Sequence, residues 1–150
     1  MYKRGGAWLG VAGLALLVAC GGVPYDPQQV PQLQVTAQLP PLLQWSPGDA
    51  QVLQIYAGDQ VRARELPLWQ LNAQFGNGLR SPVRYGEVPA TAQALMSAPT
   101  LVAGEAYTLV IRRQDSQAQA EDVQQVLDRY ETRLPFIAGE ATRSSTEVSP

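Results

Sequence analysis

The 150-residue sequence contains no histidine, only one cysteine, and no lysine after Lys3. Without histidine, the chain cannot form a Ser-His-Asp or Cys-His catalytic centre, nor a metal site with imidazole ligands. A single cysteine cannot form a disulfide within the chain or a zinc site built from several cysteines. These absences exclude common catalytic and metal-binding arrangements, and the length leaves room for one domain.

Motifs that mark other enzymes and ion sites are also missing. The sequence has no Asp-x-Asp-x-Asp calcium loop, no glycine-rich phosphate loop before a helix and no Gly-x-Ser-x-Gly nucleophile motif. Glu121 and Asp122 are adjacent carboxylates, but neighbouring residues on a helix diverge by about 100° and cannot face one substrate. We therefore expect no enzymatic activity, no catalytic residue, no metal and no cofactor.

The N-terminal residues have the pattern of a secretory signal. Lys3 and Arg4 precede residues 7–19, which carry no charge and are rich in leucine, valine and alanine. A basic segment followed by an apolar segment of this length is typical of a signal peptide. A membrane-spanning helix needs about 20 apolar residues, so this stretch is too short to span. The sequence predicts a signal peptide over residues 1–19.

The end of this segment, Leu17-Val18-Ala19-Cys20, resembles the lipobox of bacterial lipoprotein precursors. The resemblance implies that a diacylglycerol is joined to the Cys20 thiol, that the chain is cut before Cys20 and that the new amine is acylated. Gly21 follows instead of aspartate, which in this family permits sorting to the outer membrane. The alternative is a buried or accidental cysteine that follows an ordinary signal peptide.

The charge of the processed chain bears on its partners. Loss of Lys3 and Arg4 leaves nine arginines against 13 acids, a net charge of −4. An acidic exported chain argues against nucleic-acid binding. We expect an exported protein attached by lipid to the cell membrane or the outer membrane. Its partners would be that membrane and, in addition, an envelope protein or glycan.

The remaining chain divides into a tether, a domain and a tail. Residues 20–32 are rich in proline and glutamine, which predicts an extended tether. Short alternating segments separated by turns predict strands between residues 33 and 113. Apolar residues at positions 123, 126, 127 and 130 predict a helix over residues 118–131, followed by a strand over 134–138. We expect the domain to end at residue 138 and residues 139–150 to be disordered.

Two segments resemble fibronectin type III domains. Leu101 lies six residues before Tyr107, as in the corner where a tyrosine hydroxyl bonds backbone across the loop. The segment Leu43-Gln44-Trp45-Ser46-Pro47 resembles the tryptophan-bearing strand of that family and the turn after it. The resemblance implies a mainly β fold, an Ig-like or fibronectin type III-like β-sandwich, here with one short C-terminal helix and disordered termini.

A binding surface is predicted around the loop of residues 75–86, which combines aromatic, arginine and glycine residues. Such loops on sandwiches serve recognition. The candidate binding residues are Trp69, Phe75, Arg80, Arg84 and Tyr85. The alternative is a plain connection between strands, with the aromatic rings of the chain filling the core instead of stacking on sugars.

Charge is unevenly spread, since residues 60–113 hold six arginines and three acids. This basic region could meet an anionic lipid, glycan or protein. The alternative, which we favour, is neutralisation within the molecule, with the acidic segment 115–131 lying over Arg112 and Arg113.

The sequence therefore supports two functions. The first is a non-enzymatic envelope lipoprotein with a structural or protein-binding role. The second is a module that binds an envelope glycan or small ligand through the 75–86 loop. A buried Trp69 would favour the first function.

Overall fold

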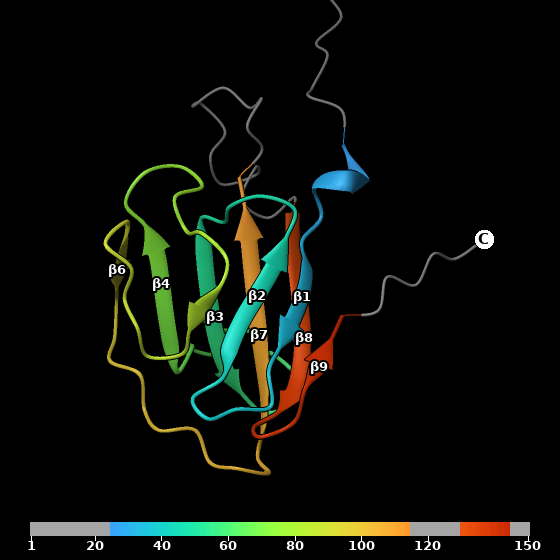
Figure 1. Cartoon of the computed structure of the whole chain (residues 1–150), viewed down its shortest axis with the longest axis vertical. Coiled ribbons are helices and arrows are strands. Elements are labelled where there is room, and N and C mark those ends of the chain that lie inside the picture. The colour runs from blue at the N-terminus through green and yellow to red at the C-terminus, as the bar shows by residue number, and fades with distance from the viewer. Residues whose placement is uncertain (1–24, 115–129, 145–150) are drawn as a thin grey trace, which may run out of the picture.

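The computed structural model describes residues 25–114 and 130–144, which form two antiparallel β-sheets packed face to face (Figure 1). The four-stranded sheet has the order β5-β2-β1-β9, with β1 (Gln32–Val35), β2 (Leu42–Ser46), β5 (Val83–Arg84) and β9 (Thr142–Arg143). The five-stranded sheet has the order β6-β4-β3-β7-β8, with β3 (Val52–Ala57), β4 (Trp69–Ala73), β6 (Ala92–Ala94), β7 (Ala106–Arg113) and β8 (Tyr130–Ile137). A short 3-10 helix, η1 (Pro27–Gln29), precedes β1.

The topology confirms the predicted mainly β fold, which is a β-sandwich. Strands β3, β7 and β8 are neighbours in one sheet, as strands C, F and G are in Ig-like domains. Strand β5 pairs with β2 in the opposite sheet, so the chain crosses between sheets after β4 and returns for β6, which pairs with β4. No helix among the described residues is long and apolar enough to cross a membrane.

The core lies between the two sheets and follows the alternation of each strand. Leu33 and Val35 of β1 are buried, whereas the glutamines beside them are partly exposed. Successive strand residues point to opposite faces, so this pattern places one face of each strand inward. The five-stranded sheet contributes the opposing inward residues, including Leu53, Ile55 and Leu109, all fully buried.

The corner before β7 has the hydrogen bond expected from the fibronectin resemblance. The backbone N–H of Val102 donates to the hydroxyl oxygen of Tyr107 at 3.0 Å, and Leu101 is buried beneath the loop. The Tyr107 ring packs against Phe136 of β8, with 5.9 Å between the ring centroids. The aromatic rings of Trp45 and Tyr107 therefore fill the core, as their strand positions predict.

The predicted end of the helix is wrong, because Tyr130 and Glu131 lie in strand β8. Tyr130 pairs with Arg113 and the strand continues in register to Ile137, so the strand predicted over 134–138 begins earlier. Tyr130 satisfies a helical spacing with earlier apolar residues, but it also begins a two-residue alternation with Leu134 and Phe136, whose side chains are buried. Residues 118–129 lie outside the described residues.

The predicted end of the domain at residue 138 is also wrong. Strand β9 pairs with β1, and the backbone N–H of Ser144 donates to the carbonyl oxygen of Leu33 at 2.8 Å. Residues 139–144 therefore belong to the sandwich, because the unpaired edge of β1 offers hydrogen bonds that a short final strand can satisfy. Residues 145–150 lie outside the described residues.

The chain enters the sandwich at one end, which we call the tether end. Strands β1 and β8 begin there, and β2, β4 and β7 finish there. Among the described residues, the tether end comprises residues 25–31, the loops of residues 47–51 and 74–82, and the adjoining strand termini (Figure 1). The opposite end, which we call the far end, carries residues 36–41, 58–68 and 98–105.

Candidate functional site

Two of the five predicted binding residues belong to the core. Trp69 at the start of β4 is 1 % exposed, and its ring meets that of Tyr85 edge to face with 4.9 Å between centroids. The Tyr85 hydroxyl donates to the carbonyl oxygen of Pro99 at 2.6 Å. Burial of the ring is the main reason that the pKa of Tyr85 is raised to about 12. This pair is therefore neutral and structural, and it offers no ring face to a sugar.

Phe75 and Arg80 lie in the 74–82 loop at the tether end. Phe75 follows the last residue of β4 by two positions, and its side chain is 86 % exposed. The Arg80 guanidinium is also largely exposed and lies 3.9 Å from the Asp49 carboxylate. An exposed ion pair at this distance contributes little to stability. The side chains of Phe75 and Arg80 are therefore both open to contact with a partner.

Arg84 lies away from this loop, because β5 carries it to the far end. Its Nε is 3.5 Å from the Glu87 carboxylate, and its Nη1 donates a long hydrogen bond of 3.5 Å to the carbonyl oxygen of Pro40. The structure therefore does not gather the five predicted residues into one site. It leaves Phe75 and Arg80 together at the tether end and separates them from Arg84 and the Trp69–Tyr85 pair.

A cavity of about 420 Å³ opens at the far end, beside Tyr85. Its lining is mainly apolar and consists of Leu39, Pro40, Tyr85, Gly86, Ala98, Pro99, Thr100 and Leu101. Tyr85 contributes the one ionisable side chain of this lining, and its hydroxyl already donates to Pro99. The cavity thus has the size of a small-ligand site but no acid–base pair.

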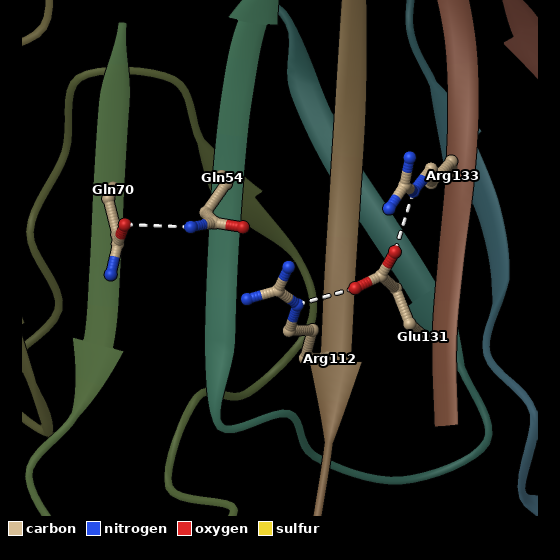
Figure 2. A network of polar contacts seen from close by, with 5 residues as sticks. All are labelled: Gln54, Gln70, Arg112, Glu131 and Arg133. Carbon is tan, nitrogen blue, oxygen red and sulfur yellow. Dashed lines mark hydrogen bonds and ion pairs between the residues drawn. The ribbon is translucent and has the colours of Figure 1, made fainter. Parts of the chain in front are cut away.

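The outer face of the five-stranded sheet carries a network of polar side chains (Figure 2). The Gln54 amide donates to Gln70 at 2.8 Å across β3 and β4. Arg112 and Arg133 each donate from Nε to a different carboxylate oxygen of Glu131, both at 2.6 Å. Gln54 is 6 % exposed although it lies on an outward face, so neighbouring side chains cover it.

Two opposing effects act on the Glu131 carboxyl at the centre of this network. Its burial favours the neutral acid and alone would raise its pKa. The hydrogen bonds and positive charges of Arg112 and Arg133 outweigh burial, so the pKa of Glu131 lies below its ordinary value. The ionised Glu131 carboxylate holds the side chains of Arg112 and Arg133 in place, which is a structural role.

The network also shows how one of the two arginines at the end of β7 is neutralised. Glu131 of the acidic segment does neutralise Arg112, but it does so as a strand residue. The Arg113 guanidinium donates instead to the carbonyl oxygen of Pro47 at 2.9 Å. The sequence does not predict a strand-to-strand pairing of Glu131 with Arg112, because the helical spacing places Glu131 in a helix. The available signal was the position of Glu131 beside the alternating apolar residues of β8.

Within residues 25–114 and 130–144, no three His, Cys, Asp or Glu side chains gather closely enough to hold a metal ion. Cys20 lies outside these residues. No protein-family model, curated protein or solved structure matches this chain.

Proposed function

We propose that this protein is an exported lipoprotein, held by lipid on Cys20 at the cell membrane or the outer membrane. The position of Cys20 carries the proposal. It ends an uncharged segment and lies five residues before Tyr25, which packs on the sandwich. Two or three acyl chains on Cys20 would give a stable anchor, because each buried CH₂ contributes about 0.8 kcal/mol. Gly21 supports the outer membrane as one of the two destinations.

The anchored domain has a structural or protein-binding role and no enzymatic activity. Support for a structural role comes from the filled core between the sheets. A lipid anchor raises the local concentration of a domain at its membrane, so weak contacts with another envelope protein become effective.

Binding of a glycan or small ligand through the 75–86 loop is the less supported function. Trp69 and Tyr85 are both buried, at 1 % and 5 % exposure, so neither ring can stack on a sugar. Phe75 alone among the predicted aromatic residues is exposed. One ring and the distant Arg84 do not form a sugar platform.

Replacement of the anchor residue tests the proposed function. The Cys20→Ser chain should lose incorporation of labelled palmitate and leave the membrane fraction, because serine offers no thiol to the diacylglyceryl group. Val102→Ser is the matched control, since it changes an exposed residue at the far end and leaves Cys20 in place. Unchanged labelling and fractionation of the Cys20→Ser chain would contradict the proposal.

A further inference from the structure

The exposed aromatic side chains of the sandwich are confined to one end. Nine aromatic residues lie within residues 25–114 and 130–144, and seven of them are at most 7 % exposed. The two exposed rings are Tyr25 at 54 % and Phe75 at 86 %. Both belong to the tether end, although 50 positions separate them in the sequence.

Phe75 is held outward by a well-fixed loop. The side-chain amide of Asn77 donates to the Gln114 carbonyl oxygen at 2.7 Å and accepts from its N–H at 2.8 Å. Ala50 and Leu79 exchange two backbone hydrogen bonds of 2.8 and 2.9 Å. Leu79 is fully buried and fastens the same loop to the core. The exposure of Phe75 is thus a property of the folded loop.

The two broad faces of the sandwich are polar by comparison. Gln32, Gln34 and Gln44 occupy outward positions on the four-stranded sheet. The five-stranded sheet presents the Gln54 and Gln70 amides and the Glu131 network (Figure 2). Neither face offers an aromatic side chain of comparable exposure, so the tether end is the aromatic surface of the described sandwich.

The length of chain between the anchor and the sandwich limits how the domain can be oriented. Five residue steps separate Cys20 from Tyr25, and an extended chain covers at most about 18 Å in five steps. Strand β7 has eight residues, which correspond to about 27 Å along the sandwich. A chain anchored at Cys20 therefore cannot invert to bring the far end to the lipid surface.

We infer that the tether end rests on the lipid surface, with the rings of Phe75 and Tyr25 in the interface between headgroups and acyl chains. This inference rests on the proposed lipid anchor at Cys20. Tyrosine concentrates at membrane–water interfaces because its ring is amphipathic, and apolar side chains such as phenylalanine enter the boundary between headgroups and acyl chains. The occupant of this surface is thus the lipid bilayer to which the chain is anchored.

Tryptophan fluorescence locates the contact. The full chain, produced in bacteria and purified from membranes, carries Phe75→Trp in one variant and Leu66→Trp in the other. Leu66 is the matched control, since it is 80 % exposed in the loop at the far end. Both variants are reconstituted into phosphatidylethanolamine and phosphatidylglycerol vesicles with either brominated or ordinary acyl chains. Trp8 is removed with residues 1–19 when the chain is processed, and Trp45 and Trp69 are buried, so both variants have the same background.

The tryptophan at position 75 should lose several-fold more emission to brominated lipid than the tryptophan at position 66. Equal quenching, or stronger quenching at position 66, overturns the orientation. If position 75 is shielded from solvent in cells but its tryptophan is not quenched in vesicles, the surface belongs to a protein partner. That result would also overturn the proposed orientation. Insertion of 12 Gly/Ser residues before Tyr25 should weaken the quenching, because a longer linker no longer holds the domain at the surface.

Flotation and the mass of the Cys20 peptide separate this inference from the proposed function. A chain with a diacylglyceryl group on Cys20 that floats with vesicles, yet shows no quenching at position 75, contradicts the orientation alone. A chain whose Cys20 carries no lipid and that stays with the soluble fraction contradicts the anchor and, with it, the orientation.

Discussion

The ring of Tyr25 stacks on the ring of Tyr130, with 5.5 Å between the centroids and 19° between the planes. The neighbouring backbone N–H of Asp26 donates to the Tyr130 hydroxyl oxygen at 3.0 Å. Tyr130 is fully buried at the start of β8. The segment predicted as an extended tether over residues 20–32 is therefore attached to the sandwich at residues 25 and 26, five and six positions after Cys20.

Tyr130→Phe should loosen this attachment without removing the ring. Loss of the hydroxyl leaves the Asp26 N–H without its acceptor, which should lower the free energy of unfolding by about 1 kcal/mol. The amide of Asp26 should exchange with solvent faster, as measured by hydrogen exchange. Unchanged exchange at Asp26 would contradict the assigned bond. Tyr130→Ala should cost about 3–5 kcal/mol, because it also leaves a cavity in the core.

Tyr107→Phe tests the corner before β7. The variant removes the acceptor of the Val102 N–H and should lower the free energy of unfolding by about 1 kcal/mol in urea denaturation. Tyr56→Phe is the matched control, since its hydroxyl has no hydrogen-bond partner within the described part of the chain, and its effect should be smaller. Equal losses for the two variants would argue that the corner hydrogen bond is unimportant.

Glu131→Gln tests the network on the five-stranded sheet. The variant should lose about 1–2 kcal/mol at pH 7, because charge-assisted hydrogen bonds to two arginines weaken; half-exposed Arg133 contributes the smaller share. In the wild type, the folded-state pKa of Glu131 lies below its ordinary value of 4.5. Its stabilisation is complete above that value and disappears as pH falls through the folded-state pKa.

The pH dependence of unfolding therefore distinguishes the variant from the wild type. Stability of the wild type should fall more steeply below about pH 5 than that of Glu131→Gln. Glu140→Gln, at an exposed turn before β9, serves as the control and should retain the wild-type slope. Identical slopes for the Glu131→Gln chain and the wild type would show that Glu131 does not contribute through its charge.

Gly48→Ala tests the close packing of the loop after β2. Gly48 has a φ of +63°, and a Cβ there would lie 2.5 Å from Nη2 of Arg113. The left-handed backbone costs about 1–2 kcal/mol for an L residue, and displacement of Arg113 from Pro47 adds about 1 kcal/mol. Gly58→Ala has a similar φ of +82° and open space around it, so it should show only the backbone cost. Equal losses would contradict the contact with Arg113.

The β-sandwich could be predicted because its signals are local. Alternation in β1 and β7 marks the buried faces, and the six-residue spacing of Leu101 and Tyr107 marks the corner. Strand β9 could not be predicted, because its hydrogen bonds depend on an unpaired edge of β1 that is more than 100 residues away in sequence. Short edge strands have little pattern of their own.

The candidate site could be predicted only in part, because the exposure of an aromatic side chain depends on where its strand ends. Trp69 and Phe75 are both aromatic and close in sequence, yet one is 1 % and the other 86 % exposed. Trp69 lies on the inward face of β4, whereas Phe75 follows the strand end, where alternation no longer applies. The stacking of Tyr25 on Tyr130 joins residues 105 positions apart, so no local pattern indicates it.

The mass of the N-terminal peptide from the membrane-derived protein tests the lipid anchor most directly. We predict a peptide that begins at Cys20 and carries a diacylglyceryl group on Sγ, with or without an acyl group on the new amine. A peptide that retains residues 1–19, or one with a free Cys20 thiol, would contradict it.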